Sequence, residues 1–146
     1  MKIKAISLWQ PWASAIVCGW KQIETRHWKT DHRGLLAIHA ARNTNGLREY
    51  RDMVDQGIPS GVSYFGDDEL DDLPRGAIVA VAHLVDVVPT ERICDRGTIY
   101  GIEFSPAERW YGNYDPERYG WVLQNVAPLA EPVPWKGSQG IFEIEC

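Results

Sequence analysis

The stretch from Gly76 to Val88 constrains the fold more than any other part of the sequence. It reads Gly-Ala-Ile-Val-Ala-Val-Ala-His-Leu-Val-Asp-Val-Val, so it combines β-branched residues with the length of a central strand. Pro89 follows it and lacks the backbone N–H that a continuing strand would need. We therefore expect a sheet with this strand at its centre.

Further strands are expected where apolar residues alternate or form a short continuous run. These segments are residues 3–8, 22–26, 34–41, 98–104, 119–129 and 140–145. Helices are expected at residues 10–19 and 45–57, the first because Pro11 suits an opening turn and Gly19 suits the position after the last turn. Residues 57–75 contain Gly, Pro, Ser and the acidic run 67–72, which predicts a solvated loop excursion.

These elements predict a mainly β, α+β fold. We expect six or seven strands and two or three flanking helices. Strands and helices do not alternate regularly along the chain, as they would in a parallel sheet. A curled, mostly antiparallel sheet or a small β-barrel fits best. The length of 146 residues suits one domain over residues 1–146.

Several classes of protein are excluded or disfavoured by composition. The cysteines Cys18, Cys94 and Cys146 are odd in number and far apart, and the four histidines show no ligand spacing, so we expect no disulfide framework, no metal and no other cofactor. No run approaches the roughly 18 apolar residues of a membrane span, and the first residues lack a signal-peptide pattern. We expect a cytoplasmic protein without a membrane partner, and no oligomeric state is indicated.

Charge is divided unevenly along the chain. The net charge is -5, which argues against a protein that coats nucleic acid through bulk electrostatics. Residues 1–51 nevertheless carry +6, and residues 52–146 carry -11. If the basic part forms one face, that face can receive a phosphate or polyanion; the charges are equally compatible with a scattered, solubilising surface.

The chemistry-bearing residues are concentrated between Gly19 and Arg26. Lys21, Glu24 and Arg26 bring an ammonium, a carboxylate and a guanidinium close to an expected helix end. If Lys21 belongs to a turn rather than to the following strand, all three side chains can line one cleft. Lys21 would then donate hydrogen bonds or act as a base. The same spacing also fits a surface ion-pair set beside an edge strand.

Tryptophans surround this cluster. The chain has seven, and four of them, at positions 9, 12, 20 and 28, lie within twenty residues of one another. Trp9 and Trp28 offer stacking surfaces for a base beside a cation that binds its phosphate or carbonyl. The alternative is that most of the seven are packed in the core.

With these residues in view, the chain resembles the ASCH (activating-signal-cointegrator homology) domain family. The segment Gly19-Trp20-Lys21-Gln22-Ile23-Glu24-Thr25-Arg26 matches its G-x-K-x-x-E-x-R signature. Similarity extends to residues 6–13, 34–41, 76–86, 119–123, 132–134 and 137–140, whereas residues 49–75 match poorly. The resemblance implies a PUA-like β-barrel with a cleft where the signature Lys, Glu and Arg meet.

The resemblance also implies what the cleft does. Family members are thought to bind RNA or nucleotide-like ligands; one branch removes acetyl from N4-acetylcytidine with a Lys, a Thr and a Glu, and another has been assigned ribonuclease activity. The Lys carries over to Lys21, but Glu24 stands where that branch has its Thr, with Thr25 displaced by one residue onto the other side of a strand. Glu108 is the candidate for that branch's catalytic Glu.

Three functions follow as hypotheses. The first is a binding module for RNA or a nucleotide-like small molecule, held by Trp9, Lys21, Glu24, Arg26, Trp28 and His39. The second is a hydrolase of a nucleic-acid component, with Lys21 and Glu24 as catalytic residues and Thr25 and Glu108 as further candidates. The third is a protein-interaction adaptor whose tryptophans mark the contact surface.

Overall fold

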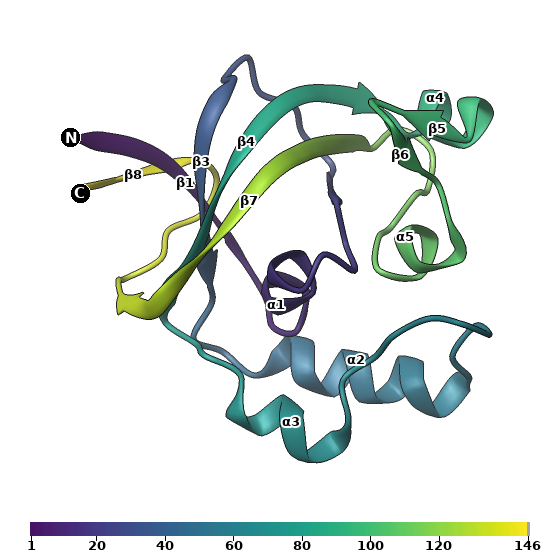
Figure 1. Ribbon diagram of the computed structural model, residues 1–146, viewed down its shortest axis with the longest axis horizontal. Helices are drawn as coiled ribbons and strands as arrows, with labels where there is room; N and C mark the ends of the chain where they lie inside the picture. The colour runs from purple at the N-terminus through teal and green to yellow at the C-terminus, as the bar shows by residue number, and fades with distance from the viewer. Residues whose placement is uncertain (146) are drawn as a thin grey trace.

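The computed structural model describes residues 1–145 and is built on strands, with helices at its lower and right-hand sides in Figure 1. The strands in this range are β1 (Lys2–Leu8), β2 (Ile23–Arg26), β3 (Gly34–Ala40), β4 (Ala77–Pro89), β5 (Thr98–Ile99), β6 (Ile102–Glu103), β7 (Tyr119–Pro134) and β8 (Phe142–Glu145). The helices are α1 (Trp12–Val17), α2 (Asn45–Gln56), α3 (Asp67–Asp72), α4 (Thr90–Arg96) and α5 (Pro106–Trp110).

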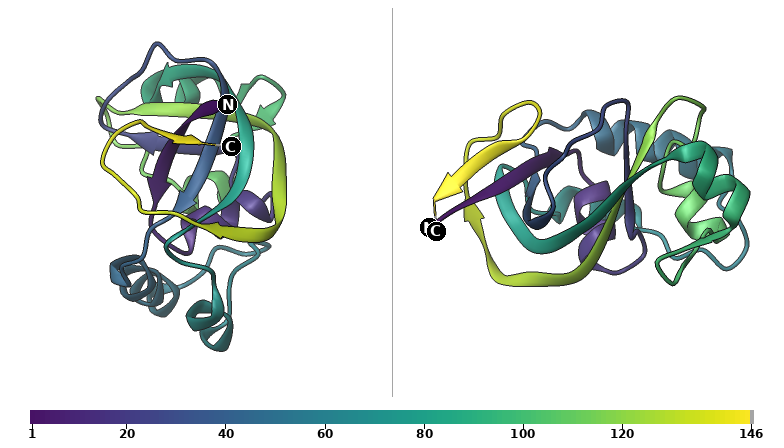
Figure 2. Two further views of the ribbon diagram at one scale, coloured as in Figure 1. Left: turned by 90° about the vertical axis from the view of Figure 1, so that its left-hand side faces the viewer. Right: turned by 90° about the horizontal axis from the view of Figure 1, so that it is seen from above.

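Six strands form one mixed sheet in the order β2-β7-β4-β3-β1-β8. Its pairings are antiparallel except for β1 with β3, which is parallel. The expected strand 76–88 is confirmed as β4, which lies between β3 and β7 near the middle of the sheet. Its register with β7 shifts at three places, and because such irregularities increase local twist, the two long strands curve strongly, as Figure 2 shows.

The expected barrel does not close. Within residues 1–145, β2 and β8 are the two edges of the sheet and do not pair with each other. β8 pairs with β1 only along Lys2–Ala5, so the last residues of β1 have an open edge. The Arg26 side chain bridges from β2 to this edge, because its Nη2 donates to the Ser7 carbonyl oxygen at 2.8 Å.

The main core lies between the concave face of the sheet and α1. Ile6, Ile38 and the α1 residue Ile16 belong to one buried cluster, whose largest member is Trp121. Alternation along β1 sends Ile6 into this cluster, while Ala5 packs into a second cluster on the other face. The residue at position 7 therefore follows Ala5 on the face opposite the main core.

A further buried cluster lies between α2, α3 and the segment after α5. Leu47, Tyr50, Phe65, Leu70 and Tyr111 are its main members. The Tyr50 hydroxyl lies 3.0 Å from that of Tyr111 and accepts from the Phe65 N–H at 3.1 Å, so the chain after α2 is held against the helix. This arrangement places α2 and α3 below α1 in Figure 1.

The expectation of a loop at the acidic run is wrong, because residues 67–72 form the helix α3. Acidic residues in a first turn interact favourably with the helix dipole, and Glu69 Oε1 accepts from the Gly66 N–H at 3.0 Å. Arg51 of α2 pairs with Asp67 at 2.7 Å and with Asp71 at 3.2 Å. Leu70 is buried at 1% exposure and anchors the helix to the core.

Other expectations are corrected in number or extent. The structure has five helices and eight strands within residues 1–145, more than the two or three helices and six or seven strands expected. The expected strand 98–104 is a hairpin of β5 and β6, because Tyr100 and Gly101 both adopt positive φ between them. The expected helix 10–19 is shorter, and strand 119–129 extends to Pro134.

Candidate functional site

The turn after α1 decides where Lys21 points. Gly19 adopts a φ of 80°, and the Trp20 and Lys21 N–H groups both donate to the Ala15 carbonyl oxygen. Lys21 therefore belongs to the turn, since β2 begins only at Ile23. Because the turn breaks the alternation of the strand, Lys21 shares one cleft with the charged residues of β2.

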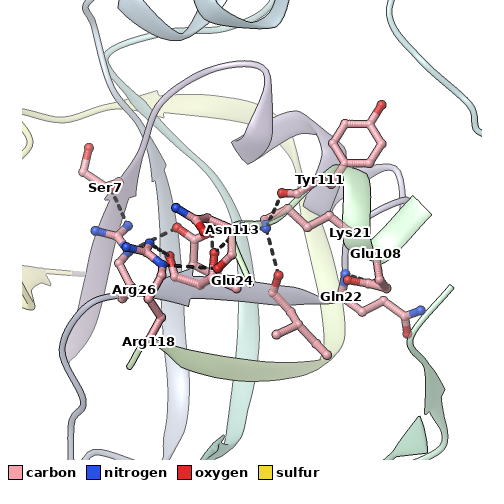
Figure 3. Close-up of polar contacts among 11 residues, drawn as sticks. Ser7, Lys21, Gln22, Glu24, Arg26, Glu108, Tyr111, Asn113 and Arg118 are labelled. Carbon is pink, nitrogen blue, oxygen red and sulfur yellow. Dashed lines mark hydrogen bonds and ion pairs between the residues drawn. The ribbon is translucent and has the colours of Figure 1, made fainter. Parts of the chain in front are cut away.

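Lys21 is buried, with 1% of its surface exposed. Its ammonium donates to the carbonyl oxygens of Ile23 and Tyr111, both at 2.8 Å, and lies 3.3 Å from Glu24 Oε1 (Figure 3). These three acceptors match the three N–H donors of an ammonium group. Lys21 therefore ties the turn, β2 and the segment after α5 together.

Glu24 lies between the two cations. Its Oε1 faces Lys21 and accepts from the Thr25 N–H at 3.2 Å, while its Oε2 accepts from Arg26 Nε at 3.1 Å. The Glu24 side chain is 12% exposed and that of Arg26 is 21% exposed. A carboxylate held in this way is an oriented hydrogen-bond acceptor at the edge of solvent.

The Thr25 side chain takes no part in the Lys21–Glu24–Arg26 ion pairs. Its Oγ1 accepts from the Asn113 N–H at 2.9 Å, and its carbonyl oxygen accepts from Arg118 Nη2 at 3.3 Å. Arg118 also donates through Nε to the Asn113 carbonyl oxygen at 3.2 Å. The Thr25 hydroxyl thus anchors the segment that follows α5.

Glu108 supports the Lys21 turn from α5. Its Oε1 accepts from the Gln22 N–H at 2.6 Å, and its Oε2 has no hydrogen-bond partner within residues 1–145. Burial raises the pKa of Glu108, and the nearby charge of Lys21 opposes that rise only in part. Glu108 lies outside the set of residues that line the cleft, so its contact with the turn is its visible role.

Lys21, Glu24 and Arg26 line a hollow of about 710 Å³, which we call the motif cleft. Its charged and polar lining residues are Ser7, Lys21, Glu24, Thr25, Arg26, His27, Glu49, Asn113 and Arg118. Trp9, Trp12, Trp110 and Tyr111 supply aromatic walls. The surface ion-pair alternative does not describe this cluster, because the charged groups converge in a concave site and Lys21 is buried.

A second hollow of about 1160 Å³, the side groove, adjoins the motif cleft. The two share Ser7, Trp9, Arg26 and His27, and Trp9 is 44% exposed at their junction. The side groove adds Trp28, His39, Arg42, Trp135, Lys136 and the loop 137–140. Among the described residues, no Asp or Glu lines it, so its lining is basic and aromatic.

The sequence-predicted residues are thus divided between two hollows. Lys21, Glu24 and Arg26 meet in the motif cleft, whereas Trp28 and His39 line only the side groove. Trp9 has the exposed ring expected of a stacking surface, whereas Trp28 packs edge-on against Trp121 at 4.8 Å between ring centroids. Sequence reasoning missed lining residues from chain segments far apart in the sequence, among them Ser7, Asn113 and Arg118.

Neither a metal centre nor a membrane span is visible in the described part of the chain. Within residues 1–145, no group of three or more His, Cys, Asp or Glu side chains is arranged to hold a metal ion. Over the same range, no helix has the length and apolar character needed to cross a membrane.

Comparison with known proteins identifies similar folds. The ASCH domain family profile matches residues 6–132. A crystal structure of ASCH from Zymomonas mobilis shares 16% sequence identity, covers 97% of this chain and 87% of that chain, and gives a TM-score of 0.55. A point mutant of it, also 16% identical, covers 97% of this chain and 89% of that chain with a TM-score of 0.55. No curated protein matches the chain.

Proposed function

The chain belongs to the ASCH domain family, and we propose that it binds RNA or a nucleotide-like ligand by holding a nucleobase in the motif cleft. The observation that carries the proposal is the Glu24 carboxylate, fixed between Lys21 and Arg26 beside the exposed ring of Trp9. Glu24 accepts from an exocyclic amine of the base, as carboxylates do when they recognise cytosine. Trp9 stacks on the face of the base.

Cations around the cleft supply the second part of the recognition. Arg26 and Arg118 line the cleft, and both present guanidinium groups suited to phosphate or carbonyl oxygens. Arg42 and Lys136 continue the positive lining into the side groove. This distribution supports an anionic ligand despite the net charge of -5, because the acidic residues of α3 lie outside both hollows.

Binding requires no proton transfer by Lys21. Its ammonium already donates to two carbonyl oxygens and pairs with Glu24, so its role in the proposal is to position that carboxylate. The adaptor hypothesis has less support. It requires several tryptophans on the contact surface, whereas among the described residues Trp9 is the one tryptophan with a large exposed surface.

The test is a binding titration with short single-stranded RNA and with single nucleotides. Binding is measured by tryptophan fluorescence or by calorimetry. Glu24→Gln should weaken binding by about 1 to 3 kcal/mol, because the neutral amide replaces a charged acceptor. Glu143→Gln is the matched control, since Glu143 pairs with Lys4 on the surface. Thermal unfolding of each variant verifies that it is folded.

Two results would overturn the proposal. The first is a wild-type protein that binds none of these probes. The second is a folded Glu24→Gln variant that binds them as tightly as the wild type, because the carboxylate would then have no part in recognition. Loss of binding in Trp9→Ala with retained folding would support the stacking role of that ring.

A further inference from the structure

Ser7 and His39 form a polar pair that the proposed binding function does not use. They are register partners on the parallel strands β1 and β3, so their side chains share one face of the sheet. Ser7 Oγ lies 2.8 Å from His39 Nδ1. Both residues line the side groove; His39 is buried at 1% exposure, and Ser7 is half-buried.

The neighbours of His39 determine which of its two ring nitrogens carries the proton. Its Nε2 lies 2.7 Å from the Trp135 carbonyl oxygen, which can only accept, so Nε2 carries the hydrogen. In a neutral imidazole Nδ1 is then the acceptor, and the Ser7 hydroxyl must donate to it. A hydroxyl that donates to an oriented imidazole is the arrangement of an activated nucleophile.

The surroundings hold the histidine ring in place. Phe142 packs against it in an edge-on contact at 5.9 Å between ring centroids. A Cβ atom at Gly137 would lie 2.6 Å from His39 Cε1 and 3.3 Å from Ser7 Oγ, so the loop approaches the pair closely. His39 therefore offers Nδ1 as a base, is oriented by the Trp135 carbonyl oxygen, and has little room to rotate.

We propose that Ser7 is the nucleophile, and His39 its general base, of an acyl-transfer site in the side groove. The substrate class is a carboxylic ester or amide on an anionic carrier, because Arg42 and Lys136 line the same groove. Arg26 is placed to stabilise the oxyanion: it has five N–H donors, of which two hold Glu24 and the Ser7 carbonyl oxygen.

The reaction balances with water as the second substrate. Ser7 Oγ attacks the carbonyl carbon while its proton passes to His39 Nδ1, and the resulting oxyanion is met by Arg26. His39 then gives that proton to the leaving oxygen or nitrogen as its bond to carbon breaks, which leaves an acyl ester on Ser7. Water, deprotonated by His39, attacks this ester, and the proton returns to Ser7 Oγ as the acid leaves.

A fluorophosphonate probe tests the pair directly. Ser7 Oγ would attack phosphorus and displace fluoride, adding one phosphonyl group per chain, which intact-mass measurement and peptide mapping detect. We expect the adduct on Ser7 in the wild type, none in Ser7→Ala, and labelling about a hundredfold slower in His39→Gln. Ser138→Ala is the matched control, because Ser138 is exposed in the same groove.

Two results would overturn the acyl-transfer proposal. A folded wild-type protein without an adduct on Ser7 overturns the proposal, and so does equal labelling of Ser7 in wild type and folded His39→Gln. If His39→Gln does not fold, the comparison within the wild type decides: Ser7 must be labelled far faster than Ser138. Nucleotide titrations are read separately, so failure of the acyl-transfer site leaves the proposed binding function standing.

Discussion

Replacing Lys21 with methionine tests whether the buried ammonium holds the site together. Methionine is unbranched, one heavy atom shorter than lysine and uncharged, so the Ile23 and Tyr111 carbonyl oxygens lose the ammonium donor. Glu24, only 12% exposed, keeps Arg26 as its remaining ion-pair partner. Breaking one partner of a buried pair costs about 3 to 5 kcal/mol. Here the loss arises from two carbonyl oxygens without the ammonium donor and from a Glu24 carboxylate that keeps only one of its two cations.

The assay is urea and thermal unfolding followed by circular dichroism. A loss of about 3 to 5 kcal/mol corresponds to a fall in melting temperature of roughly 6 to 20 °C for a chain of this size. Lys4→Met is the control: Lys4 and Glu143 are 42% and 48% exposed, so their pair should contribute less than about 1 kcal/mol.

A double variant sharpens the test. Lys21→Met combined with Glu24→Gln removes the carboxylate charge together with the ammonium, so its loss of stability should be smaller than the sum of the two single losses. A Lys21→Met protein within about 1 kcal/mol of the wild type, or a strictly additive double variant, would refute the role of Lys21 as the anchor of Glu24.

Three further predictions concern Glu108, the Tyr100–Asp86 hydrogen bond and Gly46. Because burial raises the pKa of Glu108, the folded protein should lose stability as pH rises from the ordinary glutamate value of about 4.3 to that raised pKa, and Glu108→Gln should remove this loss in pH-dependent urea unfolding. Tyr100→Phe should raise the pKa of Asp86 in an NMR titration, because the Tyr100 hydrogen bond is the largest cause of its lowered pKa; an unchanged value contradicts this. Gly46→Ala should destabilise the fold by more than about 1 kcal/mol in thermal unfolding, because its Cβ would clash with the Gln10 carbonyl oxygen.

Local patterns predicted most of the strands and the composition of the motif. The β-branched run of β4 and the amphipathic pattern of α2 can both be recognised in consecutive residues. Burial determines which neighbouring positions of a strand or helix are apolar, so the pattern is local. Lys21, Glu24 and Arg26 were identified from their charges and spacing, since all three lie within one short segment.

Long-range pairing decided the rest. The acidic segment became α3 because Arg51 and the core site for Leu70 come from elsewhere in the chain. Ser7 and His39 are 32 residues apart, and only the parallel pairing of β1 with β3 brings them to 2.8 Å. A sequence determines which chemical groups are present and how neighbours alternate, whereas contact between distant groups depends on strand order and register, which the free energy of the whole fold selects.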